Sequence, residues 1–187
     1  MLKRTLILIC LLAAARPLLL HAQEMPTEER TGELQIGLGL SRASPDYTPD
    51  HFLGPSIYAT FDFRDHWGIE ADFHDVKQSS SVQGYQGIYE KTYEIGGRYV
   101  WHPGRFDPYG KLLVGRGVFN YPYITGTTTP SANLAYNMYS VGFGVDLRTT
   151  RYLNIRLFDY ELQKWGSFPP NGLTPQVITF GAAYRFH

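Results

Sequence analysis

The sequence has a single cysteine, no excess of charge of either sign, and no apolar run long enough for a membrane-spanning helix. Its 187 residues include 17 Lys and Arg against 17 Asp and Glu. A nucleic-acid-binding protein needs a basic surface, which this balance does not supply. The apolar run at residues 5–15 falls well short of the roughly 20 residues that a spanning helix requires, and no later segment approaches that length. Nucleic-acid binding and a helical membrane fold are therefore excluded.

The first 22 residues are organised as a secretory signal peptide. Lys3 and Arg4 precede the apolar run, and Ala22 is a plausible cleavage residue. A membrane anchor is the alternative, but Arg16 and Pro17 interrupt the apolar stretch. Cleavage would remove the only cysteine and leave 14 basic and 17 acidic residues, a formal charge of −3. The mature chain is then expected to have no disulfide, no thiol nucleophile and no cysteine metal site.

What the chain has in abundance is aromatic residues, set in an alternating pattern. Tyr, Phe and Trp make up 15% of the sequence. Apolar and polar or small residues alternate with period two, which is the signature of β-strands. Eight such segments occur, at residues 34–41, 57–63, 67–74, 93–101, 108–119, 139–147, 153–162 and 178–186. A change of phase near Phe158 and Asp159 predicts a β-bulge in the seventh.

The connections between these segments alternate between short and long. The short ones are residues 64–66, 102–107 and 148–151, and the long ones are 41–55, 77–90, 120–134 and 163–175. After a polar lead-in at residues 23–30, residues 31–187 are therefore predicted to form an all-β, eight-stranded antiparallel up-and-down transmembrane β-barrel. The phase of residues 108–119 is ambiguous. The preferred arrangement puts Leu112, Val114, Arg116 and Val118 outside and Lys111, Leu113, Gly115 and Gly117 inside.

Three features favour lipid rather than water outside the barrel. Aromatic residues gather at both ends of the strands, as in the interfacial girdles of membrane barrels. Glycine is frequent on the opposite face, and long loops alternate with short turns. The expected membrane-interface aromatics at the short-turn ends are Phe63, Trp67, Tyr99, Trp101, Tyr109, Tyr152, Tyr184 and Phe186. Those expected near the long loops are Tyr58, Tyr89, Tyr121, Tyr123, Tyr136, Tyr139 and Trp165.

The terminal run VITFGAAYRFH resembles the closing strand of bacterial outer-membrane proteins. It alternates hydrophobic residues and carries Tyr184 and Phe186 near its end. The chain from residue 31 onward resembles the small OmpA/OmpX-like outer-membrane β-barrel family. That resemblance implies location in the bacterial outer membrane, and periplasmic chaperones and the barrel-assembly machinery as folding partners. It implies outer-membrane lipids and lipopolysaccharide as neighbours, and it implies no particular activity.

An eight-stranded barrel is just wide enough for side chains to fill it, so charges inside must pair with one another. The polar face predicts a charge network in the lumen, made by Asp62, Glu70, Asp72, Glu94, Arg98, Lys111, Asp146, Arg156, Asp159 and Arg185. Folding residues 67–101 about Gly84 pairs Trp67 with Trp101, Glu70 with Arg98, and His74 with Glu94. Folding about Asp65 pairs Thr60 with Glu70, and folding about Thr150 places Arg156 diagonal to Asp146.

The predicted function is that of an outer-membrane protein with a structural or surface-interaction role and an interior plugged by charged side chains. Catalysis, a cofactor and a metal are not expected. Gating by the network remains open, as does a surface ligand held by loop rings, namely Tyr47, Tyr85, Tyr89, Tyr121, Tyr123, Trp165 and Phe168. A lipid-modifying enzyme also remains open, because His74 precedes the serines at 79–81, as does a soluble lipocalin-like ligand-binding barrel. A metal site at Asp65, His66, His74 and Asp75 is disfavoured, because adjacent strand residues point to opposite faces.

Overall fold

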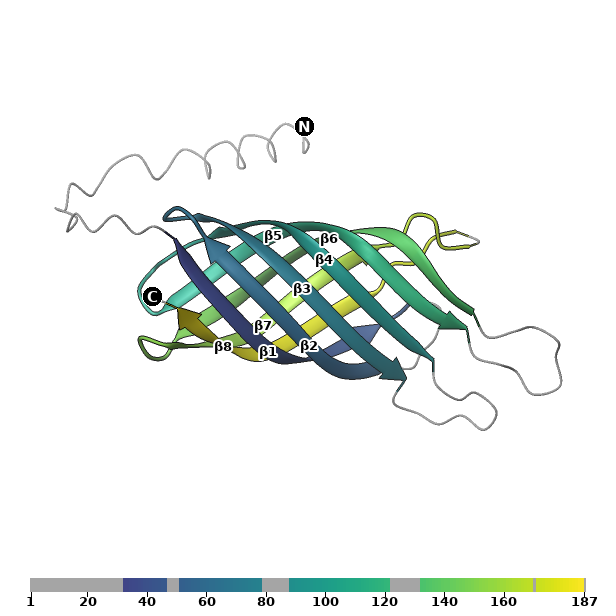
Figure 1. The fold of residues 1–187 in the computed structure, drawn as a ribbon, viewed down its shortest axis with the longest axis horizontal. Coiled ribbons are helices and arrows are strands. Elements are labelled where there is room, and N and C mark those ends of the chain that lie inside the picture. The colour runs from purple at the N-terminus through teal and green to yellow at the C-terminus, as the bar shows by residue number, and fades with distance from the viewer. Residues whose placement is uncertain (1–31, 47–50, 79–87, 122–131, 170, 187) are drawn as a thin grey trace, which may run out of the picture.

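The chain folds into one closed barrel of eight antiparallel strands (Figure 1). The computed structural model describes residues 32–46, 51–78, 88–121, 132–169 and 171–186. The strands are β1 (Glu33–Ser44), β2 (Phe52–Asp62), β3 (Trp67–Gln78), β4 (Tyr89–Val100), β5 (Phe106–Tyr121), β6 (Ala132–Arg148), β7 (Leu153–Lys164) and β8 (Gln176–Phe186). They follow one another in chain order, and β1 pairs with β8 to close the barrel. The predicted fold class is confirmed. The predicted signal peptide and the lead-in at 23–30 lie outside the described residues.

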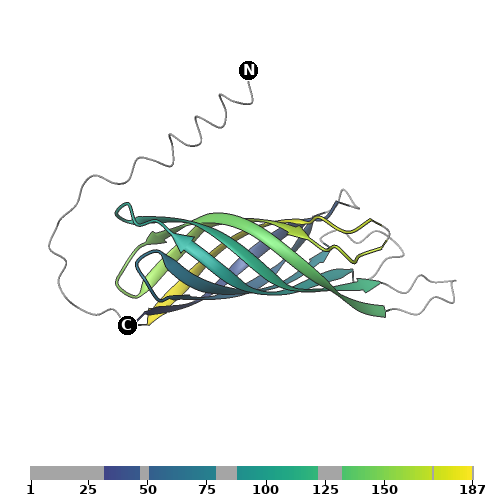
Figure 2. The ribbon, with the colours of Figure 1, turned by 90° about the horizontal axis from the view of Figure 1, so that it is seen from above.

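The two ends of the barrel differ. The short turns at 63–66, 101–105 and 149–152 lie at the end where β1 begins and β8 finishes, which we call the turn end (Figures 1 and 2). The longer connections lie at the opposite end, which we call the loop end. No helix that is long and apolar enough to cross a membrane occurs among the described residues.

The outer surface of the barrel is apolar. Outward-facing side chains include Leu40, which is 71% exposed, and Leu112, which is 68% exposed. An outer surface with so many exposed apolar side chains suits contact with lipid rather than with water. It also gives the preferred phase of residues 108–119, since Leu112 and Val114 face out while Lys111 and Leu113 are buried. The predicted bulge is confirmed as well, because the register of β7 against β8 shifts between Arg156 and Asp159.

Seven of the eight aromatics predicted for the turn-end interface are exposed, and Tyr109 is not. Tyr109 is 5% exposed and faces the lumen, so its assignment to the interface was wrong. Tyr109 lies on the same strand face as Lys111. The centroid of its ring is 4.3 Å from the guanidinium carbon of Arg98, so the inward ring makes a cation–π contact. The seven outward rings are Phe63, Trp67, Tyr99, Trp101, Tyr152, Tyr184 and Phe186.

Three rings predicted for the loop-end girdle are also inside the barrel. Tyr58, Tyr136 and Trp165 are 3%, 9% and 0% exposed, so that prediction was wrong for them, whereas Tyr139 faces outward. Aromatic residues near strand ends can serve either a girdle or an internal plug, and composition alone does not distinguish these uses. Tyr123 lies outside the described residues.

The predicted pairing of β3 with β4 is displaced by two residues. Trp67 pairs with Tyr99, Glu70 with Gly96 and His74 with Thr92, so the pairing centres on position 83 rather than on Gly84. A slip of two residues keeps every side chain on its predicted face, which is why the pattern could not detect it. The pairing of Thr60 with Glu70 is confirmed. Asp146 and Arg156 pair directly rather than diagonally.

Two glycines make room for inward rings. A Cβ atom on Gly37 would lie 2.2 Å from the ring of Tyr58, its partner across β1 and β2. A Cβ atom on Gly117 would lie 2.3 Å from the ring of Trp165. Glycine at these positions therefore lets a large aromatic side chain lie flat against the inner wall.

Substitution of Gly117 tests whether the Trp165 ring is packed as described. We expect Gly117→Ala to lower the free energy of unfolding by about 1–3 kcal/mol, because the added methyl group overpacks the ring. Gly97→Ala is the matched control, since nothing lies within 4 Å of its Cβ position. Urea unfolding of the protein in lipid vesicles, followed by heat-modifiable gel migration, measures both. Equal stability of the two variants would contradict the packing.

Candidate functional site

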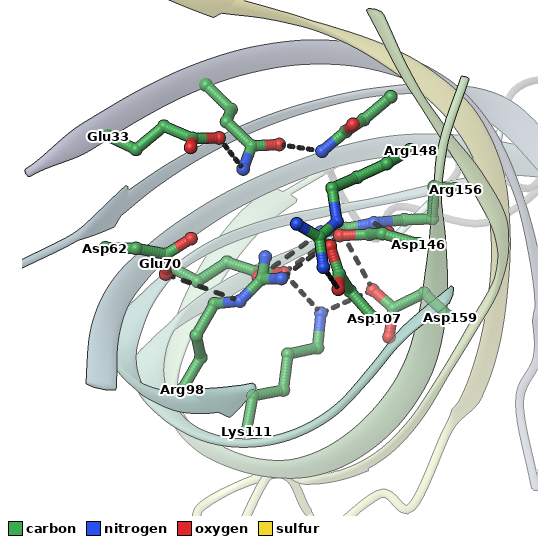
Figure 3. A network of polar contacts seen from close by, with 12 residues as sticks. Glu33, Asp62, Glu70, Arg98, Asp107, Lys111, Asp146, Arg148, Arg156 and Asp159 are labelled. Carbon is green, nitrogen blue, oxygen red and sulfur yellow. Dashed lines mark hydrogen bonds and ion pairs between the residues drawn. The ribbon is translucent and has the colours of Figure 1, made fainter. Parts of the chain in front are cut away.

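The barrel interior is the part of the molecule richest in chemistry. All ten residues predicted for the lumen network face inward, nine of them buried and Asp62 half-buried. They come from β2 to β8. Figure 3 shows seven of them, Asp62, Glu70, Arg98, Lys111, Asp146, Arg156 and Asp159, pointing toward one another inside the barrel. The sequence therefore placed these groups on the right face, and the structure shows which of them touch.

Lys111 occupies the centre of the network. Its Nζ atom lies 3.0 Å from Glu70 Oε1, 2.7 Å from Asp72 Oδ2 and 2.5 Å from Asp159 Oδ2. A fourth carboxylate, that of Glu161, is 2.6 Å away. Glu161 was not among the predicted residues, although it lies on the same face of β7 as Asp159. The ammonium group of β5 thus binds side chains of β3 and β7, strands that are not its neighbours.

Two arginines complete this cluster. Arg98 donates to Glu70 at 2.9 Å and to Asp146 at 3.1 Å. Arg156 donates to Glu70 at 3.0 Å, to Asp146 at 3.2 Å and to Asp159 at 3.2 Å. Of the predicted pairs, Glu70–Arg98 is therefore a real contact, although the two residues are not register partners. We call Glu70, Asp72, Arg98, Lys111, Asp146, Arg156, Asp159 and Glu161 the charge cluster.

Aromatic rings cover the guanidinium groups. The Arg156 guanidinium carbon lies 3.7 Å from the ring centroid of Tyr58 and 5.1 Å from that of Tyr109. A cation over an aromatic face gains most when it is desolvated, as here. The inward tyrosines therefore belong to the same structure as the charges.

A polar layer lies on the loop side of the charge cluster. Glu94 accepts hydrogen bonds from Ser140 at 2.5 Å and from the Gln163 amide at 2.9 Å. His74 lies against Glu161, with 3.7 Å between Nε2 and Oε1. The predicted contact between His74 and Glu94 is not a register pair, because Glu94 pairs with Asp72.

His74 also contacts Ser41, so a serine, a histidine and the carboxylate of Glu161 lie next to one another in space. Ser41 Oγ is 2.9 Å from His74 Nδ1 and 2.7 Å from Thr179 Oγ1. All are buried. A lipid-modifying hydrolase would need such a group on the outer face at the membrane boundary, whereas this one faces the lumen. The arrangement is best explained as hydrogen-bond satisfaction of buried polar groups.

Two groups of side chains could each offer three ligand atoms to a metal ion. They are Asp72, His74 and Glu161, and Glu70, Asp72 and Asp159. Lys111 Nζ lies within hydrogen-bond distance of carboxylates in both groups. Its ammonium therefore supplies the positive charge at the place where a metal ion would bind. The disfavoured candidate set of Asp65, His66, His74 and Asp75 is split between the turn end, the lumen and the outer face.

An apolar cap closes the loop end. Phe119, Tyr136, Met138, Trp165 and Leu173 form a buried cluster against which Phe168 packs. Trp165 and Leu173 pair across the base of the β7–β8 connection, which carries their side chains into the barrel. We call the five buried residues the apolar cap. Trp165 is fully buried there and presents no surface to a ligand, whereas Phe168 is half-buried. Tyr47, Tyr85 and Tyr123 lie outside the described residues.

The turn end is polar and holds a cavity of about 370 Å³, which we call the vestibule. The ion pairs in its lining include Glu33 with Arg185 at 2.5 Å and Asp107 with Arg148 at 2.7 Å. Arg185 was predicted to lie in the lumen, but its partner Glu33 was not. His102, in a turn, lies 2.8 Å from Asp107, and this hydrogen bond raises the pKa of the imidazole above its ordinary value.

The family described as outer membrane protein beta-barrel domain matches residues 7–186. No curated protein sequence matches the chain. Among solved structures, Neisserial surface protein A and OprG from Pseudomonas aeruginosa both superpose with a TM-score of 0.61, at 14% and 17% identity. The alignments cover 83% and 84% of this chain and 97% of each of the others.

A third structure carries a ligand. Ail of Yersinia pestis, in complex with the heparin analogue sucrose octasulfate, superposes with a TM-score of 0.56 at 20% identity. The alignment covers 83% of this chain and 97% of Ail. At these identities the similarity shows a shared fold and no more.

Removal of the central ammonium tests the charge cluster. We expect Lys111→Met to lower the free energy of unfolding by about 3–5 kcal/mol, because four buried carboxylates lose a shared partner. Lys91→Met is the control: its only ion pair among the described residues joins it to Asp75 at 3.3 Å on the outer face, where a loss below about 1 kcal/mol is expected. At acidic pH the difference in the free energy of unfolding between wild type and Lys111→Met should become smaller, because protonated carboxyl groups no longer repel one another. Urea unfolding in vesicles at two pH values measures this, and a small, pH-independent loss would count against the cluster.

Proposed function

The chain belongs to the outer membrane protein beta-barrel domain family, and on that premise we propose that it is a closed, non-conducting barrel that interacts with lipopolysaccharide. The observation that carries the proposal is the filled interior. Side chains of the charge cluster and of the apolar cap occupy successive levels between the turn end and the loop end. A water-filled path for ions has no place in such a lumen.

The charge cluster makes a poor gate. Arg98, Lys111 and Arg156 each contact at least three carboxylates within 4.0 Å. A side chain that swung aside to admit an ion would leave buried carboxylates without a partner, at a cost of several kcal/mol. The apolar cap is a second barrier, because it is built mainly from apolar side-chain surface and the indole N–H of Trp165 already donates to Gln163. We therefore propose a plug with a structural role rather than a regulated pore.

Conductance measurements test the closed barrel. In planar bilayers the wild-type protein should carry no steady current. Arg98→Ala and Trp165→Ala should each stay closed, because each leaves the other barrier in place, and the double variant should show intermittent openings. Heat-modifiable migration of each preparation confirms that a folded barrel was inserted. A steady current through the wild-type protein would overturn the proposal.

The outer face suggests the partner. The outward-facing charged side chains of the described strands lie toward the loop end, and five of them are basic. They are Arg42, Lys77, Lys91, Arg116 and Lys164, which we call the basic belt, and Asp75 accompanies Lys91. In this family the long loops face outward from the cell. With that orientation the basic belt lies at the level of the lipopolysaccharide phosphates, and about 1 kcal/mol per basic residue is expected from such contacts.

Neutralising part of the basic belt tests this partner. The triple variant Lys77→Gln, Arg116→Gln and Lys164→Gln should lose about 3 kcal/mol of the extra stability that lipopolysaccharide confers over neutral phospholipid. The matched control neutralises three exposed turn-end arginines: Arg64→Gln, Arg105→Gln and Arg151→Gln. Urea unfolding in nanodiscs with and without lipopolysaccharide, at low and high salt, gives the comparison. Equal losses in the two triple variants would contradict a specific role for the belt.

The remaining partners follow from family membership. We propose that a periplasmic chaperone and the barrel-assembly machinery deliver the chain to the outer membrane, and that the machinery recognises β8 as the closing strand. Its outward face carries Phe180, Tyr184 and Phe186. Catalysis is not part of the proposal, because the buried Ser41–His74–Glu161 series lies outside the vestibule and away from lipid. A soluble ligand-binding barrel is not supported either, since the apolar face points outward.

A further inference from the structure

The vestibule is a cavity that neither the closed barrel nor the lipid contacts explain. Its volume of about 370 Å³ is within the range of small-molecule sites. Turn residues and Gly32 line it at the turn end, and Arg98 and Asp146 of the charge cluster line it toward the barrel interior. Most of its lining residues are polar or charged, and Phe63 and Val100 add apolar surface. A ligand that fits it therefore needs polar groups that match this lining.

Four polar atoms on its lining have no hydrogen bond among the described residues. They are two acceptors, Asp62 Oδ1 and Asn154 Oδ1, and two donors, Arg98 Nε and Arg148 Nε. The residues Arg98 and Asn154 are 2% and 3% exposed. Arg98 Nε and Asp62 Oδ1 are 3.9 Å apart, too far for a direct hydrogen bond. Buried polar groups normally have partners, so these four atoms point to a guest that donates and accepts at once.

Other buried polar side chains of the lining are engaged with one another. Asn154 Nδ2 donates to Gln35 Oε1 at 2.8 Å, and Gln35 donates to Glu33 at 3.0 Å. Glu33 is held by Arg185, and Asp107 by Arg148 and His102. These contacts hold the lining in place, so the four atoms without a hydrogen bond are held in fixed positions.

The charge of the lining selects the kind of guest. It contains five carboxylates and four guanidinium groups, together with His66 and His102. With the charges so nearly balanced, a strongly anionic or cationic guest would leave a charge uncompensated. We propose that the vestibule binds a small zwitterion, whose ammonium group is held by Asp62 and Asn154 and whose carboxylate is held by Arg98 and Arg148. A free amino acid or a dipeptide has this chemistry.

The test uses L-alanyl-L-alanine and two blocked analogues with the wild-type protein in lipid nanodiscs. The N-acetyl analogue lacks the ammonium group, and the C-terminal amide lacks the carboxylate. Calorimetry should show saturable binding of the zwitterion, and NMR should show shifts of the Asn154 and Gln35 side-chain amides. Each blocked analogue should bind about tenfold more weakly or worse, the effect of removing one charged hydrogen-bonding group.

Protein variants supply the reciprocal evidence. Asp62→Asn should weaken binding of the dipeptide more than binding of the N-acetyl analogue. The variant removes the partner of the ammonium group, which the analogue lacks already. Arg148→Gln should act in the same way on the carboxylate and the amide analogue. Asp75→Asn and Arg151→Gln remove equal charges away from the vestibule and should bind as the wild type does. Heat-modifiable migration verifies that every variant is folded.

Three outcomes would overturn the proposal: no saturable binding by the wild type, equal binding of the zwitterion and both blocked analogues, or shifts confined to the loop end. Placing the vestibule in the periplasm rests on the proposed orientation of the barrel, whereas binding in nanodiscs does not. A failed binding test therefore leaves the closed barrel standing. Conversely, conductance through the wild-type protein would overturn the closed barrel but would not decide whether the vestibule binds a zwitterion.

Discussion

The ammonium group of Lys111 is the contact on which the barrel interior depends. Hydrogen bonds between neighbouring strands close the wall of a barrel, but they do not connect walls that face each other. Lys111 on β5 does so by binding carboxylates of β3 and β7. Arg98 and Arg156 add contacts to β3 and β6 that share Glu70 and Asp146. The narrow lumen imposes this arrangement, because charges that have no water must find one another.

The charge cluster fills the middle of the lumen with ionised groups rather than with apolar side chains. Within the charge cluster five carboxylates face three cations, and Glu94 and His74 lie beside it on the loop side. An interior chosen for stability alone would be apolar, since well-packed hydrophobic side chains often outperform buried ion pairs. The apolar cap shows that this chain builds such packing elsewhere in the same lumen. A charged middle is therefore better understood as fixing how the strands register and which walls meet than as a source of net stability.

The sequence predicted the barrel, its eight strands and the face of nearly every side chain, because period two determines facing directly. It did not predict the pairing of β3 with β4, since a slip of two residues leaves the pattern unchanged. Tyr109 was predicted to lie outside although Lys111, two residues later on the same strand, was predicted to lie inside. Residues two apart on a strand face the same way, so this comparison would have placed Tyr109 inside. The prediction omitted Glu161, whose facing depends on the bulge near Phe158. The cavity at the turn end could not be predicted at all, because empty space is set by side-chain conformation and leaves no pattern in the sequence.

The two ends of the lumen impose a direction on the molecule. At the loop end, apolar side chains fill the lumen, with Trp165 at 0% exposure. At the turn end, Asp62, Asn154 and Arg148 line a cavity, and each has a buried polar atom without a hydrogen bond in the described part of the chain. The charge cluster lies between these two environments. The outer face also differs between the two ends, with the basic belt toward the loops. The lumen and the outer face thus share one polarity along the barrel axis, although different residues form them.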